Sequence, residues 1–153
     1  MTTKLHIICD SRGVPLGLTT SQGQRHDSVF FEIVAEQGRR RGRGRKLRPV
    51  KAISADNAYQ IKRINRWCRN RRIERVIPSN KRQRHYMNRR PGPNPTFDKE
   101  KYRRRNVVER LIGWLKENRR IAMRFEKLAQ NFRAMATLAV IRRLLPLLPM
   151  RAA

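Results

Sequence analysis

The chain has 153 residues, a length that suits one compact domain, and no shift in composition marks a second. Its 38 Lys and Arg residues outnumber 11 Asp and Glu residues, and the formal net charge of +27 indicates nucleic acid as a partner rather than an acidic protein or a lipid surface. The sequence has no signal-peptide pattern, no zinc or disulfide spacing, and an apolar tail at 144–150 that is too short to span a bilayer, so we expect a cytoplasmic protein.

The first part of the chain predicts a β-hairpin followed by a short helix. Residues 5–9 and 16–20 form β-prone runs on either side of turn chemistry at residues 12–15. Asp27 or Ser28 is then expected to cap the N-terminus of an apolar helix. We therefore interpret Asp27 as a capping residue rather than a catalytic one.

Two stretches are predicted to be basic surface loops. Residues 39–49 interleave Arg and Lys with Gly and cannot bury their charge. Arg43 and Arg45 in this loop are candidates for contacts with DNA phosphates, and a purely solvated basic run is the alternative. Residues 79–98 are polar, basic and rich in Pro and Gly, and such a long loop could close over a substrate.

A strand at residues 50–55 leads directly into Asp56 and then into a helix. Ligands of open α/β sheets gather at the C-terminal ends of strands, so Asp56 marks a place where a metal could bind. The alternative is an ordinary helix cap. A further strand is expected at residues 75–78. The inner face of the intervening helix is expected to carry Ile61, Ile64, Trp67 and Cys68.

Two C-terminal helices are predicted, at residues 99–125 and 127–145. At 100° per residue, four polar residues of the first helix lie within roughly 60° of arc. This polar face is separate from an apolar stripe on the same helix. A carboxylate beside a guanidinium, an ammonium and a phenol suits the binding of a metal-bound phosphate. The alternative is a solvated face with ion pairs such as Arg105 to Glu109. The polar face consists of Tyr102, Arg105, Glu109 and Lys116, and the apolar stripe of Val108, Leu111, Ile112 and Leu115.

Two acids from distant parts of a basic chain, Asp56 and Glu109, suit two-metal phosphoryl transfer. No Walker loop or Gly-x-Ser-x-Gly elbow is present to suggest another chemistry. The polar face matches the Tyr, Arg, Glu, Lys signature of bacterial insertion-sequence transposases, and the chain resembles the acid-triad group of insertion sequence families four and five. Residues 2–16, 23–28 and 124–132 also resemble that family, in the same order along the chain.

The resemblance implies a ribonuclease-H-like α/β fold over residues 1–153, with a mixed sheet, flanking helices and a C-terminal helical segment. It also implies a bacterial, nucleoid-associated enzyme that uses Mg²⁺ or Mn²⁺ to cut the ends of a mobile element and join them to target DNA. Asp56 would be the second acid and Glu109 the third, both as metal ligands. Arg105 and Lys116 would contact phosphates, with Tyr102 beside them. Double-stranded DNA is the implied partner, and a homodimer is a further expectation.

The chain departs from the family at two places. It reads Asp56-Asn57-Ala58-Tyr59 where the family usually has Asp, Lys, Gly, Tyr, which removes one cation. The family's first acid lies on a strand that would precede Met1, and we interpret Asp10 as a hairpin residue that does not replace it. We therefore expect a fold without its first strand, and an incomplete site that needs an upstream segment or belongs to a broken element. A non-catalytic basic nucleic-acid-binding protein, in which Asp56 and Glu109 need not converge, is the alternative.

Overall fold

The structure is a computed structural model, and it describes residues 2–39, 50–78 and 97–147. The chain begins with an antiparallel hairpin of β1 (Thr3–Cys9) and β2 (Pro15–Gln22). Both strands are longer than the sequence predicted. The carboxylate of Asp10 closes the turn by accepting hydrogen bonds from the N–H groups of Arg12 and Val14, each at 2.9 Å. Asp10 is thus a hairpin residue, as expected.

A short 3-10 helix, η1 (Asp27–Val29), leads from the hairpin into α1 (Phe31–Arg39). The next unit contains β3 (Ala52–Ser54), the 3-10 helix η2 (Asn57–Tyr59), α2 (Lys62–Asn70) and β4 (Glu74–Val76). β3 and β4 are parallel, with α2 as the connection between them. Ile64, Trp67 and Cys68 of α2 are buried and Ile61 packs against them, which confirms the predicted inner face.

The predicted single helix at residues 99–125 is wrong. The chain instead forms α4 (Lys99–Arg103), α5 (Asn106–Glu117) and α6 (Arg119–Ala122). The first break is a tight turn, in which the N–H of Arg105 bonds to the carbonyl of Tyr102 at 2.9 Å. At the second break the backbone of Asn118 is extended, and its side-chain amide donates to the carbonyl of Leu115 at 3.2 Å. α7 (Ala129–Leu144) and the 3-10 turn η3 (Leu145–Leu147) complete the described chain.

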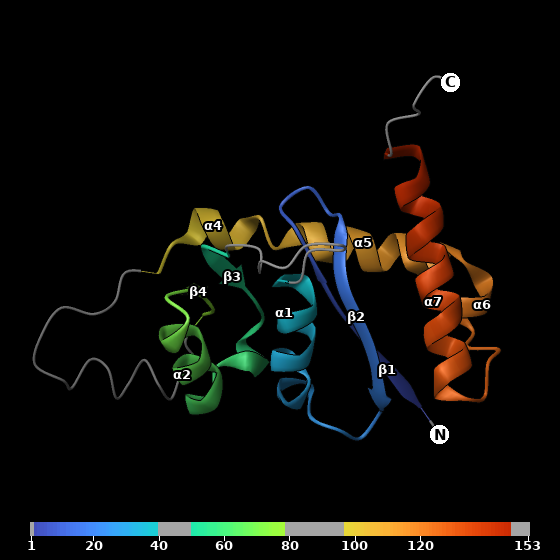
Figure 1. The fold of residues 1–153 in the computed structure, drawn as a ribbon, viewed down its shortest axis with the longest axis horizontal. Helices are drawn as coiled ribbons and strands as arrows, with labels where there is room; N and C mark the ends of the chain where they lie inside the picture. Colours follow the sequence, from blue (N-terminus) through green and yellow to red (C-terminus); the bar gives the residue numbers. More distant parts are fainter. Residues whose placement is uncertain (1, 40–49, 79–96, 148–153) are drawn as a thin grey trace, which may run out of the picture.

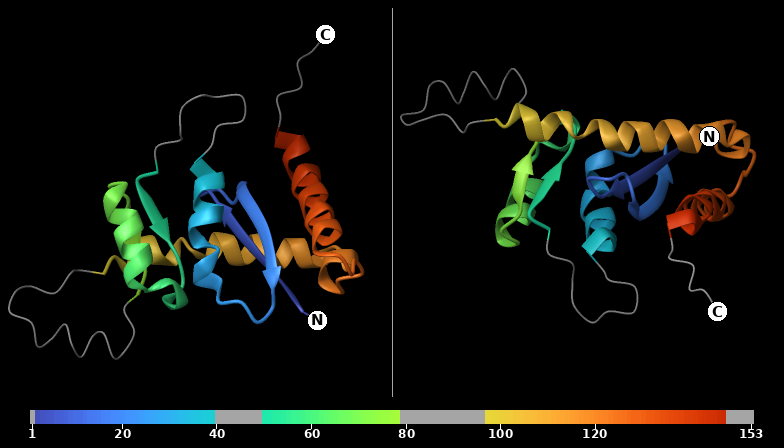
Figure 2. Two further views of the ribbon diagram at one scale, coloured as in Figure 1. Left: turned by 60° about the horizontal axis from the view of Figure 1, so that its bottom comes forward. Right: turned by 90° about the horizontal axis from the view of Figure 1, so that it is seen from above.

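Helices cover both faces of the hairpin, as the three views show (Figure 1; Figure 2). Successive side chains of a strand point to opposite faces, and β1 follows this rule. Leu5, Ile7 and Cys9 pack into a cluster with α5 and α7. On the other face, His6 stacks on Phe30 just before α1, with ring centroids 4.7 Å apart. α4 and α5 lie nearly on one line, which runs along both two-stranded units (Figure 2).

Among the described residues the core consists of two clusters. The first joins α1 to α2, β3 and β4, and the second joins α5 and α7 to the hairpin. The buried members of the first cluster are Phe31, Ala35, Ile53, Ile64, Trp67, Cys68, Ile73 and Ile77. Those of the second are Leu111, Leu115, Ile121, Phe132, Ala136 and Ala139. Val108 and Ile112 are half-buried, so the predicted apolar stripe of α5 does face the core.

The mixed α/β composition is as predicted, but the arrangement of the strands is not. Within residues 2–39, 50–78 and 97–147 the strands form two separate two-stranded sheets, one antiparallel and one parallel, instead of one mixed sheet. Among the described strands, β1 pairs only with β2 and β3 pairs only with β4. No described strand therefore joins the two pairs by hydrogen bonds.

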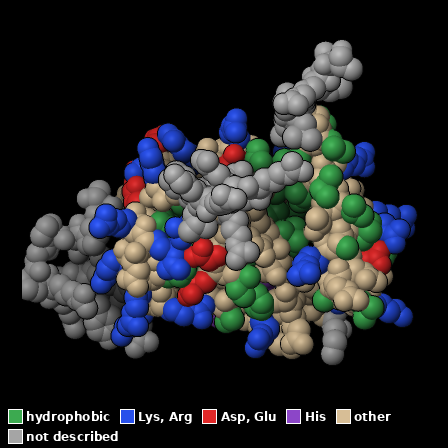
Figure 3. All heavy atoms as spheres, in the orientation of Figure 1, with side chains coloured by type: hydrophobic (Ala, Val, Ile, Leu, Met, Phe, Trp, Pro, Cys, Tyr) green, Lys and Arg blue, Asp and Glu red, His purple; other side chains and the backbone are tan. Residues whose placement is uncertain are grey.

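Lys and Arg side chains are scattered across the face seen in Figure 3, between apolar and other side chains. Apolar side chains gather along α7 on the same face (Figure 3). Leu138 of α7 is 57% exposed and Leu145 of η3 is 58% exposed. None of the helices in the described ranges is long and apolar enough to cross a membrane.

Candidate functional site

The polar face predicted around Glu109 is assembled from α4, α5 and the turn between them. Nη2 of Arg105 lies 2.5 Å from Oε1 of Glu109, and the Arg105 guanidinium lies 5.3 Å from the ring centroid of Tyr102. Tyr102 is in turn 5.3 Å from the ring of Phe97. The structure therefore brings Tyr102, Arg105 and Glu109 together, although not on one helix.

Arg105 provides a fixed positive charge within this cluster. Its partial burial acts to lower its pKa, but the nearby Tyr102 and Glu109 outweigh that effect and leave the pKa raised. Only 24% of the Arg105 side chain is exposed, whereas 54% of Glu109 is exposed. The carboxylate of Glu109 is therefore open to solvent while one of its oxygens is held by the guanidinium. This is the ion pair that the sequence offered as the plain alternative to a metal site.

Lys116 does not join the cluster. It is exposed in the last turn of α5, about two helical turns from Glu109, and makes no hydrogen bond or ion pair among the described residues. Arg43 and Arg45 lie outside the described residues. Of the described residues on the predicted polar face, the structure thus brings Tyr102, Arg105 and Glu109 together and leaves Lys116 apart.

Asp56 lies just beyond β3, in the order that the sequence predicted. Its carboxylate accepts a hydrogen bond of 2.5 Å from the N–H of Asn57 and so caps η2. The residue is exposed. Asp56 therefore caps η2, which was the alternative to metal binding, and its side chain is also accessible to solvent.

Asp56 and Glu109 make no hydrogen bond or ion pair with a shared partner in the described part of the chain. No group of three or more His, Cys, Asp and Glu side chains there is arranged to hold a metal ion. Carboxylate oxygens are suitable ligands for Mg²⁺, but Mg²⁺ needs near-octahedral coordination. The described residues by themselves do not fit a metal centre.

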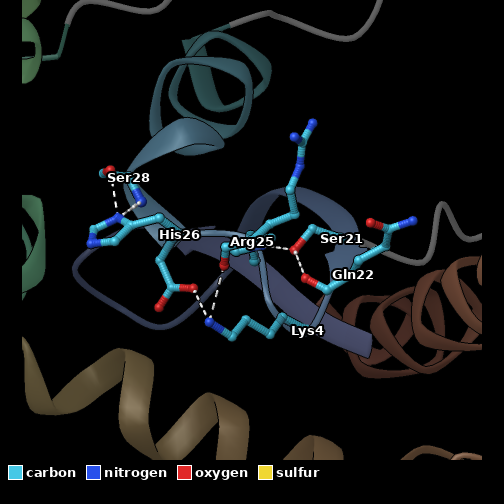
Figure 4. A network of polar contacts seen from close by, with 8 residues as sticks. Lys4, Ser21, Gln22, Arg25, His26 and Ser28 are labelled. Atoms are coloured by element: carbon cyan, nitrogen blue, oxygen red, sulfur yellow. Dashed lines mark hydrogen bonds and ion pairs between the residues drawn. The ribbon is translucent and has the colours of Figure 1, made fainter. Parts of the chain in front are cut away.

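The expected capping role of Asp27 is wrong. The cap of η1 is His26, whose Nδ1 accepts from the N–H of Ser28 at 3.3 Å (Figure 4). Asp27 instead forms an ion pair of 2.9 Å with Nζ of Lys4 on β1. The same Lys4 nitrogen donates to the carbonyl of Arg25 at 3.1 Å (Figure 4). The predicted capping role rests on the residues next to Asp27 in the sequence. The ion pair of Asp27 is instead formed with Lys4, which lies 23 positions earlier.

Tyr59 ends the Asp56-Asn57-Ala58-Tyr59 segment and matches the Tyr of the resembling family, but the sequence predicted no role for it. It packs beside Phe31 with ring centroids 5.7 Å apart, where η1 meets η2. Burial raises the pKa of its phenol to about 12, and the charges of Asp27 and then Asp56 act in the same direction. The phenol therefore lies in the electrostatic field of both carboxylates. The signal for it in the sequence is the agreement of Asp56 and Tyr59 with the Asp, Lys, Gly, Tyr pattern of that family.

Comparison with known proteins identifies the family. Residues 1–144 match the family model of the transposase DDE domain. This chain belongs to that family. It is 32% identical over 129 residues to a protein of Burkholderia cepacia named as a transposase for insertion sequence element IS402, covering 83% of this chain and 55% of that protein. It is 30% identical over 141 residues to a protein of Brucella ovis named as a transposase for insertion sequence element IS6501, covering 91% of this chain and 95% of that protein.

The chain thus spans about half the length of its Burkholderia relative and nearly all of its Brucella relative. No solved structure matches the chain. The family assignment confirms the resemblance drawn from the Tyr, Arg, Glu, Lys spacing and the collinear segments.

Proposed function

We propose that this chain is the catalytic part of an insertion-sequence transposase and acts in DNA transposition, cutting the ends of a mobile element and joining them to target DNA. The observation that carries this proposal is the DDE-domain match over residues 1–144. The two acids support it, because each lies exposed on a separate element, Asp56 after β3 and Glu109 on α5. The substrate is double-stranded DNA in the bacterial cytoplasm, at the nucleoid.

Each site residue has a role in this proposal. Asp56 and Glu109 would be carboxylate ligands for a divalent cation, Mg²⁺ or Mn²⁺, which would supply the activation of phosphodiester oxygens. Arg105 orients Glu109 and offers its guanidinium to a phosphate, with Tyr102 packed against it. Arg43, Arg45 and Lys116 contact phosphates further along the DNA. Because the described acids do not form a metal centre alone, a third carboxylate must come from elsewhere.

An upstream transposase segment is the proposed source of that carboxylate. Among the described strands, β1 and β3 each pair on one edge only. Open strand edges present unpaired N–H and C=O groups and readily accept another strand. A strand that ends in Asp and inserts between β1 and β3 would join the two pairs into one mixed, ribonuclease-H-like sheet. Residues 1–153 would then form a single domain with the added strand.

The test is reconstitution of activity. Residues 1–153 are co-produced with an upstream segment that carries a strand ending in Asp, and Mg²⁺-dependent nicking of duplex element ends is measured. Nicking should require the added segment and should be lost when its Asp becomes Asn, or with D56N or E109Q. The matched control is E32Q, because Glu32 forms a similar ion pair with Arg63 at 3.0 Å outside the proposed site.

One result would refute the missing-acid proposal. Strand transfer by residues 1–153 alone, abolished by D10N, would show that Asp10 is the first acid. The amide oxygen of Asn can still accept the N–H bonds of Arg12 and Val14, so D10N should keep the turn.

The second candidate function is non-catalytic binding of nucleic acid. The observation that favours it is the direct ion pair of Arg105 with Glu109, which satisfies the acid without a metal. Under this function E109Q and D56N would leave DNA binding unchanged and no segment would restore nicking. Homodimer formation is a further proposal, tested by the molar mass of the protein in solution with and without DNA.

A further inference from the structure

The corner where α5, α6 and α7 meet contains two adjoining hollows, of about 430 Å³ and about 280 Å³. Asn118 and Arg142 line both hollows, and we refer to the two adjoining hollows together as the depression. Trp114, Glu117 and Arg143 complete the first hollow. The second has an apolar floor that includes Ile121, Leu138 and Ala139.

Two arginines at this corner are held against aromatic rings. The guanidinium of Arg143 lies 4.7 Å from the ring centroid of Trp114, and that of Arg119 lies 5.9 Å from the ring of Phe125. A guanidinium on an aromatic face keeps its orientation and leaves its N–H groups free to meet an anion. The corner therefore presents positive charge on rigid supports.

The arginines of the corner differ from the other ring-stacked arginines in the described ranges. Arg71 and Arg105 also lie over rings, but each forms an ion pair with a glutamate, at 2.9 Å and 2.5 Å respectively. In the described part of the chain, Arg119 and Arg143 have no such carboxylate. Their charge is available for a ligand.

The charge of the depression is strongly positive. Its lining includes Arg119, Arg120, Arg142 and Arg143 against the single acid Glu117. Arg120 is neutralised by Glu126, at 2.6 Å. The side-chain amide of Asn118 is already used to cap the carbonyl of Leu115 at 3.2 Å, which holds the end of α5 in place. An anionic partner suits this surface.

We propose that the α5–α6–α7 corner binds the phosphate backbone of duplex DNA, as a contact separate from the Glu109 face. The inference rests on the proposed function, in which the chain acts on DNA. Trp114 is five residues beyond Glu109, about 140° around α5, so the two surfaces point in different directions. Forked guanidiniums match phosphate oxygens, and the apolar floor can receive the deoxyribose of the same backbone.

The test compares two double variants with the same charge. R142A/R143A removes two cations from the corner, and R66A/R69A removes two exposed cations from α2, which have no partner in the described residues. Each lowers the net charge from +27 to +25, since 27 − 2 = 25. Binding of the full chain to a short duplex is measured across a series of salt concentrations.

R142A/R143A should weaken binding about tenfold and reduce the slope of log affinity against log salt by about 1 to 2, since each phosphate contact contributes about 0.9. R66A/R69A should change both much less. R143K should recover only part of the loss, because lysine keeps the charge but lacks the planar fork. Arg142 is exposed, so R142A serves as the second variant if loss of the Trp114 stack lowers stability.

Equal weakening by the two double variants would overturn the inference, because the effect would then be one of overall charge. Polyglutamate that competes with DNA at equal charge and depends on the same arginines would indicate an acidic protein partner and would also overturn it. If the unaltered chain does not bind duplex DNA, the proposed function fails with it. If it binds and R142A/R143A behaves like the control, only this inference fails.

Discussion

Arg105 and Glu109 form an ion pair of 2.5 Å between the turn after α4 and the first turn of α5. Only two residues further along, Leu111 is 1% exposed and belongs to the core of α5, α7 and the hairpin. The same helix therefore carries a solvent-facing acid and a fully buried side chain within about half a turn. This proximity allows activity and stability to be tested separately.

E109Q should fold normally and change the free energy of unfolding by at most about 1 kcal/mol, because exposed ion pairs contribute little. Leu111→Ala should cost about 2–5 kcal/mol through the cavity that it leaves. Urea denaturation of both variants measures the difference. If E109Q were as destabilising as Leu111→Ala, Glu109 would be a structural residue and its assignment as a metal ligand would lose support.

Two glycines should respond in opposite ways to replacement by alanine. A Cβ on Gly17 of β2 would lie 2.8 Å from Cβ of Gln37 and 2.9 Å from the carbonyl oxygen of Val34 on α1. Gly17→Ala should therefore destabilise the protein by about 1–3 kcal/mol, since the hairpin and α1 must separate. A Cβ on Gly113 of α5 meets no atom within 4 Å. Gly113→Ala should raise stability by about 0.5–1 kcal/mol, and thermal unfolding of the pair provides the comparison.

The stability of the protein should fall at mildly acidic pH because of His6. Its side chain is buried, with Nε2 2.7 Å from Oγ of Ser21, and burial is the main cause that lowers its pKa below 6.5, with Asp27 acting against it. Below pH 6.5 the unfolded chain takes up this proton more readily than the folded chain. The contribution of neutral His6 is complete above pH 6.5 and declines as the pH falls from there toward the folded pKa.

The difference between the unaltered protein and His6→Gln isolates this effect from the carboxylates. Plotted against pH, the difference in unfolding free energy should be flat above pH 6.5. It should change with pH between pH 6.5 and the folded pKa of His6. A difference that stays constant down through this window would show that His6 does not couple folding to protonation.

Binding to duplex DNA should be weakly sequence-specific and strongly dependent on salt, because the charge is +27. R43A/R45A should reduce the slope of log affinity against log salt by about 0.9 for each phosphate contact that is lost, if Arg43 and Arg45 contact the DNA backbone. Affinity for two unrelated duplexes over a range of salt concentrations measures both properties. Affinity that does not vary with salt would argue against phosphate contacts altogether.

The sequence by itself determined the hairpin, the inner face of α2, the course of α7 and the position of Asp56 after a strand. Hydrophobic periodicity and turn chemistry act over a few neighbouring residues, so a single chain is enough to reveal them. The apolar stripe of α5 was predicted for the same reason, with Leu111 and Leu115 buried as expected. The collinear motifs also indicated the family.

The tertiary structure alone decided the contacts between distant residues. Lys4 draws Asp27 away from a capping role, and Arg143 rests on Trp114 although 29 positions separate them in the chain. Neither the break at Arg105 nor the break at Asn118 contains the Pro or Gly that would have indicated it in the sequence. Likewise, strand pairing depends on which edges meet in space, and the β-propensity of a segment says nothing about its neighbour. The local sequence pattern determines a helix or a strand. The partner of a charged side chain or of a strand edge depends on how the helices and strands pack.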